Sequence, residues 1–382
     1  MKNSFTLFTL YIIAFIGFAG FSFLFPVIPL YATELGATVS QVGLIVATIS
    51  YVTAFFLIPF GMLSDKFGRH KLLVGGLTIF TLAPLLYPLA TNSQQLILVR
   101  AIHGLAAAAF LPTAIALVVD LTPEAKRGEA IGWYTASLQL GLMAGPITGG
   151  FLTGHFGFDA AFYGCSVISL IGLVLAFSRL RAIAHRPAAT PGRASSSWRW
   201  LGQPLAIAVL LAPLLVAVGS GTIGSYIPLY GRGFGMTETD AGAIITALYA
   251  SSAILRAPAG RLADKIDRKL LLIGGVGLSA VAVSLFSFFH SLSQFIIIGV
   301  VFGIGMGIAM PASLTMAADF SSTGGRGLSM AIPTCFFQVG LAAGPTAMGF
   351  VAGVSDYETM FLACALSLAV GLLIMLGLMR AR

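Results

Sequence analysis

Hydrophobic residues run through this chain in long stretches, and polar residues gather in the short segments between them. Each stretch holds about 20 or more residues, which as a helix crosses a hydrocarbon core of about 30 Å. We predict twelve such spans, at about residues 5–31, 40–63, 71–91, 94–119, 128–153, 160–179, 205–230, 239–260, 269–290, 293–318, 327–354 and 359–379. The pattern therefore predicts an all-α membrane protein with twelve transmembrane helices and little room for a soluble domain.

The chain repeats itself with a constant offset of 199 residues and without a gap. The segment Ile28–Tyr31 returns as Ile227–Tyr230, and Asp65, Asp120 and Pro146 return as Asp264, Asp319 and Pro345. Two homologous halves of like orientation are the architecture of transporters that rock around a midplane site. We expect two pseudo-symmetric six-helix bundles, 1–180 and 204–382, joined by a basic cytoplasmic linker at 181–203.

The charged residues predict how the chain is oriented in the membrane. Only 9% of the residues are charged, against roughly 25% in soluble domains. With the N-terminus inside, 18 of the 21 basic residues fall in cytoplasmic segments, and the outer loops hold six acids and only Arg232. Basic residues favour the cytoplasmic side, so both termini are expected there, in the inner membrane. The net charge of +8 thus reflects topology and predicts no nucleic-acid partner.

A short polar loop follows the second predicted span and carries a specific pattern of glycines and charges. Its motif residues are Gly61, Asp65, Lys66, Gly68 and Arg69, and a degenerate copy in the second half keeps Asp264 and Arg268. With this loop the chain resembles the major facilitator superfamily, whose signature here is G-x-L-x-D-[RK]-x-G-[RK]-[RK]. The resemblance covers nearly the whole chain and implies two six-helix bundles that alternate access to a central substrate site.

The aspartate of this loop lies where it can act as a gate. At the membrane surface Asp65 can interact with a helix N-terminus and with nearby arginines. Asp120 and Arg127 flank the next cytoplasmic loop and are the expected partners, with Asp319 and Arg326 as their counterparts. The resemblance implies the same gating role for the family's aspartate. The alternative is a basic loop that serves only to orient the chain.

The fifth span contains closely spaced glycines followed by a proline. They match the family's antiporter motif, g-x8-G-x3-G-P-x2-G-G, in full, and the second half keeps part of it. The predicted pivot residues are Gly141, Gly145, Pro146, Gly149, Gly150, Gly344 and Pro345. Such glycines allow close backbone approach, and a proline removes one helical hydrogen bond. The resemblance implies a bending helix associated with export, whereas generic tight packing is the alternative.

Two polar residues lie inside the fourth span. Arg100 and His103 match the family motif R-x-x-[QH]-G, and an arginine within a membrane span is a functional hypothesis by default. The second half has Gly299 and Phe302 at these positions, so topology alone does not require the charge. We expect proton or substrate coupling here, with Glu34 as a further candidate. The alternatives are an arginine that snorkels outward and a histidine that only packs.

The predicted spans contain no aspartate or glutamate away from their ends. A cavity with two cations, Arg100 and Arg256, and no anion should favour neutral amphiphilic or anionic substrates over dicationic ones. Arg256 could instead snorkel to the inner surface. The family's cavity-lining spans supply the candidate contacts, each of which could equally be packing: Tyr51, Gln139, Tyr226, Tyr230, Tyr249, Arg256, Met306, Met310, Phe337 and Gln338.

The expected function is therefore a secondary exporter of small molecules, driven by exchange for protons. No phosphate-binding P-loop is present, so the proton gradient is the expected energy source, and we expect no cofactor and no metal. The expected partners are a small-molecule substrate, protons and the lipid bilayer, with the chain as a monomer. An importer, a facilitator or a lipid-like flippase of the same fold is the alternative. A membrane enzyme or sensor is more distant, because neither H-E-x-x-H nor G-x-S-x-G occurs.

Overall fold

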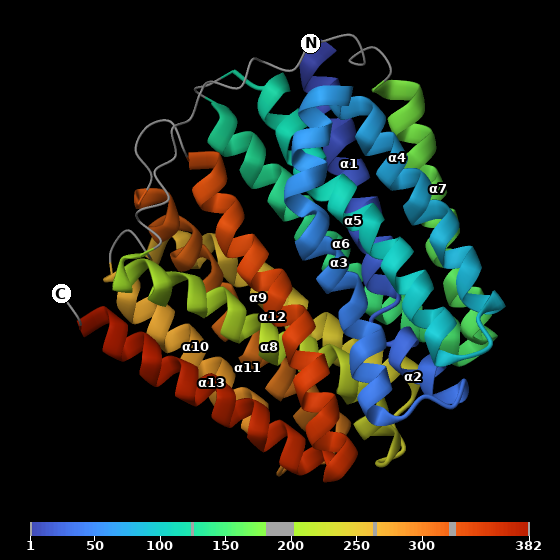
Figure 1. Cartoon of the computed structure of the whole chain (residues 1–382), viewed down its shortest axis with the longest axis vertical. Helices are drawn as coiled ribbons and strands as arrows, with labels where there is room; N and C mark the ends of the chain where they lie inside the picture. Colours follow the sequence, from blue (N-terminus) through green and yellow to red (C-terminus); the bar gives the residue numbers. More distant parts are fainter. Residues whose placement is uncertain (1, 124–125, 181–201, 263–265, 321–325, 381–382) are drawn as a thin grey trace. The chain divides into compact units, whose positions relative to one another are not determined.

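The computed structural model describes residues 2–123, 126–180, 202–262, 266–320 and 326–380 (Figure 1). These residues contain helices and turns, and no strand occurs within the described ranges. The helices of the first sequence half are α1 (Lys2–Phe23), α2 (Val27–Glu34), α3 (Val39–Phe67), α4 (Arg69–Leu82), the 3-10 helix η1 (Ala83–Leu89), α5 (Ser93–Leu121), α6 (Arg127–Phe156) and α7 (Phe158–Arg179). Those of the second half are α8 (Pro204–Arg232), α9 (Glu238–Leu262), α10 (Arg268–Leu285), α11 (Leu292–Asp319), α12 (Arg326–Val354) and α13 (Tyr357–Arg380).

The predicted all-α membrane architecture is confirmed. Ten segments of the described chain are long and apolar enough to cross a membrane, and two of these are continuous runs over α1–α2 and α4–η1. The remaining two predicted spans are α6 and α9, which have the length but are less apolar. Both are rich in glycine, alanine, serine and threonine, the small residues that membrane helices use to pack closely on one another.

Two predicted spans are not single regular helices. The first is interrupted by a turn at residues 24–26, between α1 and α2. The third changes from α-helix to 3-10 helix at Ala83. Prolines explain both changes, because Pro26, Pro84 and Pro88 lack the N–H that a continuing α-helix needs. The second interruption places Tyr87 in η1.

The chain divides into two compact units. Unit 1 contains residues 1–37, 48–190 and 237–246, and unit 2 contains residues 38–47, 191–236 and 247–382. Each unit thus consists mostly of one sequence half but includes a ten-residue segment of the other. These segments, Thr38–Ala47 at the start of α3 and Thr237–Thr246 at the start of α9, are related by the 199-residue offset. We call them the exchanged segments.

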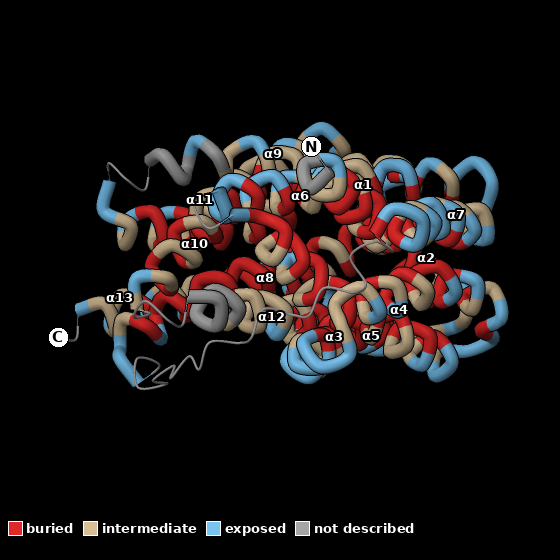
Figure 2. The backbone as a smooth tube through the Cα atoms, turned by 90° about the horizontal axis from the view of Figure 1, so that it is seen from above, coloured by how far each residue is buried: buried red, intermediate tan, exposed pale blue. Residues whose placement is uncertain are grey.

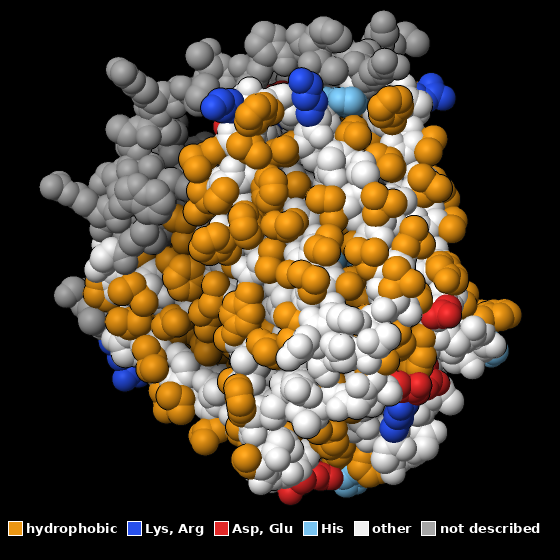
Figure 3. All heavy atoms as spheres, turned by 45° about the vertical axis from the view of Figure 1, so that its right-hand side comes forward, with side chains coloured by type: hydrophobic (Ala, Val, Ile, Leu, Met, Phe, Trp, Pro, Cys, Tyr) orange, Lys and Arg blue, Asp and Glu red, His pale blue; other side chains and the backbone are white. Residues whose placement is uncertain are grey.

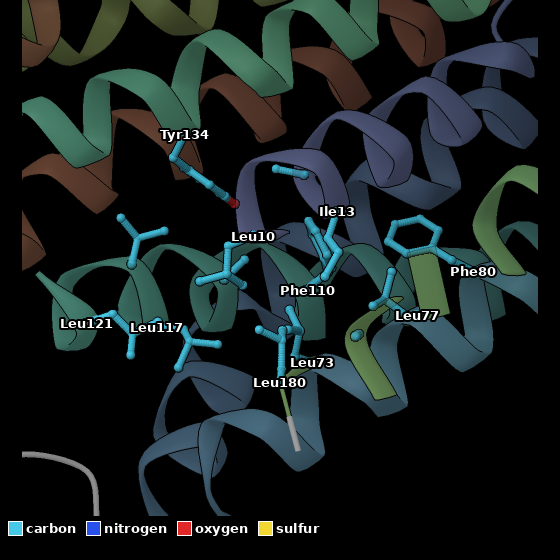
Figure 4. Packing of buried hydrophobic residues seen from close by; sticks show 14 of the residues in the cluster. Leu10, Ile13, Leu73, Leu77, Phe80, Phe110, Leu117, Leu121, Tyr134 and Leu180 are labelled. Atoms are coloured by element: carbon cyan, nitrogen blue, oxygen red, sulfur yellow. The ribbon is translucent and has the colours of Figure 1, made fainter. Parts of the chain in front are cut away.

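The core of unit 1 is a cluster of aliphatic and aromatic side chains (Figure 4). Leu10 and Ile13 of α1 meet Leu73 of α4 and Phe110 of α5 there. Tyr134 of α6 is 2% exposed and turns its ring into the same cluster. The cluster holds α1, α4, α5 and α6 together by close packing, and Ala176 of α7 joins it.

The outer surface carries the residues that a lipid-facing surface needs. Along α7 buried and exposed stretches alternate (Figure 2), and Val167, Leu170, Ile171 and Val174 are exposed apolar side chains. Hydrophobic side chains cover the middle of the face in Figure 3, with Lys and Arg at its upper edge and both acidic and basic side chains toward its lower edge. An apolar band between polar margins is the surface of a membrane-spanning protein.

Candidate functional site

Glycines of the predicted pivot on α6 lie against α1. A Cβ added to Gly141 would meet the carbonyl oxygen of Phe15, and one added to Gly149 would overlap that of Phe23. The Ser22 hydroxyl, on α1, donates to the carbonyl of Gly141 at 3.1 Å. Backbone-to-backbone contact of this kind requires glycine. The predicted close approach is therefore confirmed, while the role of these residues as a pivot stays a prediction.

The second half repeats this packing between α12 and α8. A Cβ on Gly340 would overlap the carbonyl of Leu214, and one on Gly344 would overlap that of Val218. Gly340 and Gly344 are the repeat partners of Gly141 and Gly145. The same positions therefore bring two helices into close backbone contact in both halves, as the partly retained motif predicts.

The exchanged segments pack on the two proline-containing helices. In unit 1 a Cβ on Gly242 would overlap the carbonyl oxygen of Pro146, and in unit 2 a Cβ on Gly43 would overlap that of Pro345. All four residues are related by the repeat offset. The first turns of α9 thus lie directly on the pivot region of α6, and those of α3 lie on α12. The sequence reasoning missed Gly43 and Gly242, although their conserved spacing in the repeat was a usable signal.

Each exchanged segment is also held by hydroxyl groups, but not by the same ones. In unit 2, Ser40 of the segment donates to the Gly349 carbonyl at 2.9 Å, and next to Gly43 the hydroxyl of Tyr226, from α8, donates to the Pro345 carbonyl at 2.7 Å. In unit 1, Thr239, the repeat partner of Ser40, is 3.5 Å from the Gly150 carbonyl. Tyr226 was predicted as a substrate contact, and the structure shows its hydroxyl bound to backbone.

Thr246 completes the contact in unit 1. Its hydroxyl donates to the carbonyl of Met143 at 3.0 Å and accepts from the amide of Ile147 at 3.1 Å. The repeat partner of Thr246 is Ala47, which has no hydroxyl. The two exchanged segments therefore have the same backbone packing and different polar contacts.

The two polar residues of α5 lie inside unit 1. Arg100 is 3% exposed and His103 is fully buried. His103 Nδ1 is 3.1 Å from the hydroxyl of Tyr87, and the Arg100 side chain hydrogen-bonds the same tyrosine. The alternative that Arg100 snorkels outward is therefore wrong, because a turn of η1 supplies a buried partner. We call Arg100, Tyr87 and His103 the buried polar network.

The donors and acceptors of this network can be assigned by elimination. A guanidinium only donates, so the Tyr87 oxygen accepts from Arg100 and its own proton is available to His103 Nδ1. A neutral imidazole that accepts at Nδ1 carries its proton at Nε2. That nitrogen is buried and makes no hydrogen bond to another described residue. Protonating Nδ1 would make it a donor and would force the Tyr87 proton to turn elsewhere, so the network has two arrangements that differ by one proton.

Aromatic rings enclose the buried polar network. The His103 ring meets Phe21 and Phe80 edge to face, with centroids 6.3 and 5.3 Å away. Tyr87 stacks on Phe162 at 5.0 Å. Tyr87 was absent from the predicted site residues. Its signal in the sequence was a tyrosine between two prolines, Pro84 and Pro88, at the end of a span.

Glu34, the third predicted coupling residue, lies apart from this network at the exposed end of α2. Its carboxylate acts electrostatically on Tyr31 of the same helix, whose hydroxyl donates to the backbone carbonyl of Tyr87 at 3.2 Å. The structure connects Glu34 to the network through Tyr31 and the backbone of η1.

Ion pairs form at the predicted gate in both halves. Arg69 pairs with Asp120 and, at 3.2 Å, with Asp65. Its repeat partner Arg268 pairs with Asp319 at 2.6 Å. The cluster predicted around Asp65 is present, but the arginine that joins its two acids is Arg69 of the same loop.

The remaining predicted gate residues are not part of the ion pairs described above. Arg127 is exposed at the start of α6, and no ion pair between it and another described residue is formed. Lys66 lies over the Phe67 ring at 5.6 Å. Gly68 has a φ of 95°, a backbone conformation that favours glycine, and it precedes the first residue of α4. Asp264 and the side chain of Arg326 lie outside the described residues.

Unit 2 holds the second cation of the spans. Arg256 of α9 is partly buried and lies close enough to Tyr249 to act on its hydroxyl electrostatically. The Tyr249 hydroxyl is in turn 3.4 Å from that of Ser220 on α8. The first half has Leu57 in place of Arg256, so this polar cluster belongs to one half only.

The other predicted cavity residues differ in exposure. Tyr51 is 41% exposed, whereas Gln139, Met306 and Met310 are buried. Tyr230 is buried as well, and its hydroxyl donates to Glu358 at 3.0 Å. Phe337 and Gln338 are partly exposed on α12. Their roles as substrate contacts stay predictions.

Acidic residues stay out of the middle of every described helix. Each aspartate and glutamate in the described ranges lies in a loop, at a helix cap or within the first or last turn. The expected absence of a carboxylate at membrane depth therefore holds for the part of the chain that the structure describes.

Helices, repeat and motifs define a two-unit membrane transporter fold, and comparison with known proteins identifies the family. The sequence profile of the Major Facilitator Superfamily matches residues 10–232 and 209–382. The chain therefore belongs to this superfamily, and it is a transporter rather than an enzyme.

Named relatives include multidrug exporters. The chain is 26% identical to the multi-drug resistance efflux pump PmrA of Streptococcus pneumoniae, over 91% of this chain and 89% of that protein. It is also 26% identical to the multidrug resistance protein MdtG of Klebsiella pneumoniae, over 90% and 86% of the two chains.

Solved structures agree on the fold. A bacterial homologue of the human lysosomal transporter Spinster matches with a TM-score of 0.84 and 17% identity, over 99% of this chain and 97% of that one. The nucleoside transporter NupG matches with a TM-score of 0.78 and 15% identity, over 99% and 100% of the two chains. At this identity the likeness concerns the fold alone.

Proposed function

We propose that this chain is a secondary exporter of small neutral amphiphilic or anionic molecules that works by proton antiport. The observation that carries the proposal is the buried polar network, a histidine and an arginine joined by a tyrosine inside a unit whose described spans hold no carboxylate at depth. A protein that only needed a packed core would avoid the cost of burying these groups.

Export as the direction of transport has two supports. The full antiporter motif lies on α6, where its glycines contact α1. Two relatives that align over about nine tenths of this chain are described as efflux or multidrug resistance proteins. The exporter would lie in the inner membrane with both termini in the cytoplasm, since the basic residues gather in the segments on that side.

Proton coupling would run through His103. Imidazole is the side chain whose ordinary titration lies nearest physiological pH, His103 is fully buried, and its Nε2 has no described hydrogen-bond partner. Uptake of a proton would create a second cation beside Arg100 and reverse the donor role of Tyr87. Charge repulsion and a reversed hydrogen bond are the local changes that a conformational transition can use.

The substrate class follows from the charges of the spans. Arg100 and Arg256 supply positive charge, and acids occur only at helix ends within the described ranges. A dicationic substrate would lose its hydration there without gaining a counter-charge. Neutral amphiphiles need no counter-charge, and an anion could use Arg256 with the neighbouring Tyr249 and Ser220 hydroxyls.

Transport by the purified protein in proteoliposomes tests the proposal. A panel of fluorescent neutral, anionic and dicationic amphiphiles would be followed under an imposed pH gradient, and counterflow without a gradient would report gradient-independent exchange. We expect pH-driven movement of neutral or anionic probes, and its loss in His103→Gln with counterflow retained. His155→Gln is the matched control, because that ring is exposed at the end of α6.

Three results would count against the proposal. Full gradient-driven transport by His103→Gln would remove His103 from coupling. Preference for dicationic probes would refute the substrate class. Equal transport with and without the pH gradient would favour a facilitator of the same fold.

A further inference from the structure

The Thr246 hydroxyl contacts both members of one backbone hydrogen-bonding pair of α6. In an α-helix the N–H of a residue bonds the carbonyl four residues earlier, so Ile147 N–H and Met143 C=O are natural partners. The Thr246 hydroxyl donates to that carbonyl at 3.0 Å and accepts from that amide at 3.1 Å. The hydroxyl therefore lies beside one backbone hydrogen-bonding pair of α6 and can serve as the partner of both groups.

This step adjoins the proline of α6. Pro146 has no N–H, so the carbonyl of Leu142 has no intrahelical donor. Side chains inserted into the hydrogen-bond ladder and prolines are two recognised causes of helix bending. Here a proline and a hydroxyl from a different helix, α9, meet the backbone of one helix at neighbouring positions.

The surrounding contacts bring Thr246 to this position. Gly242, one turn earlier on α9, has no side chain and lies against the Pro146 carbonyl, where a Cβ would overlap it. Thr239, a further turn away, is 3.5 Å from the Gly150 carbonyl. The exchanged segment thus follows α6 for two turns, and Thr246 makes the two shortest of its hydrogen bonds to α6.

The other exchanged segment lacks this arrangement. Its residue at the same repeat position is Ala47, its hydroxyl contact with α12 is made by Ser40, and the tyrosine that bonds α12 nearby, Tyr226, comes from α8. Tyr226 donates to the proline carbonyl itself, and among the described residues its hydroxyl accepts from no amide of α12. A hydroxyl that engages both a carbonyl and an amide of the proline-containing helix is therefore a feature of α6 within the described chain.

We propose that Thr246 is a positioning residue that latches the segment Thr237–Thr246 onto α6, and that its release lets Ile147 N–H bond Met143 C=O directly. Both arrangements satisfy the Met143 carbonyl and the Ile147 amide, so the latch can open without leaving either backbone group unpaired in the membrane. In the transport cycle of the proposed exporter, on which this inference rests for its functional meaning, the step would couple movement of α9 to the geometry of the antiporter-motif helix.

The expected size of the effect is modest. Loss of the latch removes about one net hydrogen bond, because the α6 groups can pair with each other when Thr246 leaves. A net hydrogen bond corresponds to about a fivefold shift in the equilibrium, equivalent to about 1 kcal/mol. A valine at this position keeps the shape of the side chain and removes only the hydroxyl.

A reporter disulfide measures whether the segment is on α6. The Cβ of Glu238 is 3.9 Å from the position of a Cβ built on Gly154. This separation suits a disulfide, so the double substitution Glu238→Cys and Gly154→Cys should cross-link when the segment is packed. The native Cys335 is partly exposed and would be replaced by alanine, whereas Cys165 and Cys364 are buried.

A second reporter pair exists at the related positions of unit 2. The Cβ of Ser40 is 3.8 Å from a Cβ built on Gly353, which is the repeat partner of Gly154. The double substitution Ser40→Cys and Gly353→Cys therefore reports the other exchanged segment with similar geometry. It verifies that each variant is folded, because a misfolded chain loses both cross-links.

Cross-linking rates would be measured in lipid vesicles without substrate or pH gradient, for the parent and three variants. We expect Thr246→Val to slow formation of the first disulfide about fivefold, and Thr246→Ser, which keeps a hydroxyl, to stay near the parent. Thr148→Val is the matched control on α6. Its hydroxyl bonds only the Ala144 carbonyl of its own helix, at 2.8 Å, so it should change nothing.

The outcomes separate this inference from the proposed function. An unchanged rate in Thr246→Val, or equal slowing by Val and Ser, would overturn the latch. Thr246→Val could also lose both disulfides while Thr246→Ser and Thr148→Val keep them. That result would overturn the latch, because it would mean that the Thr246 hydroxyl is needed for folding. Because the assay uses neither substrate nor protons, failure of proton-driven export in vesicles would leave its result unaffected.

Discussion

Removal of the Tyr87 hydroxyl provides the most direct test of the buried polar network. Tyr87→Phe keeps the ring that stacks on Phe162 and removes the oxygen shared by His103 and Arg100. A neutral interhelical hydrogen bond in a membrane protein is worth about 0.6 kcal/mol, and one to a charged group about 1.5 kcal/mol or more. We therefore expect the free energy of unfolding to fall by about 2 kcal/mol.

The measurement is reversible unfolding in mixed micelles, with Tyr163→Phe as the control. Tyr163 lies on α7 and is 50% exposed, so removing its hydroxyl should change stability by no more than about 0.5 kcal/mol. A double-mutant cycle of Tyr87→Phe with His103→Gln should show coupling, since both changes remove the same bond.

The pH dependence of transport is a second measurement, which a loss of stability alone would leave unchanged. If Tyr87 governs which nitrogen of His103 carries a proton, Tyr87→Phe should shift the pH dependence of transport as well as its rate. A destabilisation below about 0.5 kcal/mol with an unchanged pH profile would refute the reasoning. Such a result would mean that Arg100 and His103 are satisfied without the tyrosine.

Three further predictions concern other parts of the molecule. Gly242→Val should slow formation of the reporter disulfide more than tenfold, because its side chain overlaps backbone, whereas Gly224→Val meets open space and should not. A double-mutant cycle of Arg69→Gln and Asp120→Asn should give a coupling of about 1.5 kcal/mol in unfolding free energy, and additive effects would contradict the ion pair. The Thr359 amide donates to Asp356 and lowers the pKa of that carboxyl, so Asp356→Ala should lower the melting temperature at neutral pH. The carboxylate's contribution is lost as pH falls through its lowered pKa, so the difference from wild type should vanish there; a difference that persists in acid would contradict this origin.

Much of the fold could be predicted from the sequence because the bilayer imposes simple rules. Span length follows from membrane thickness, and the spans appear as long apolar stretches. The 199-residue repeat predicts that paired positions make related contacts, and the ion pairs of Arg69 and Arg268 follow it. The glycines of α6 likewise predict close packing, and Gly141 and Gly149 meet the α1 backbone.

Breaks within helices were less predictable. Hydropathy treats α1 and α2 as one span and α4 and η1 as another, because the residues at both interruptions are apolar. The prolines mark these places, but a proline does not by itself decide between a kink, a turn and a 3-10 helix. That choice placed Tyr87 beside His103, a contact between residues 16 positions apart.

The sequence by itself determined the membrane class, the twelve spans, the two-fold repeat and the motifs of the superfamily. Tertiary structure decided which polar groups meet: Tyr87 with His103, and Thr246 with the α6 backbone. The physical reason is that nearly all residues of a buried membrane helix are apolar, so periodicity does not specify which face meets which neighbour. Close packing of small residues sets the rotation and depth of each helix, and only then do the few polar side chains acquire their partners.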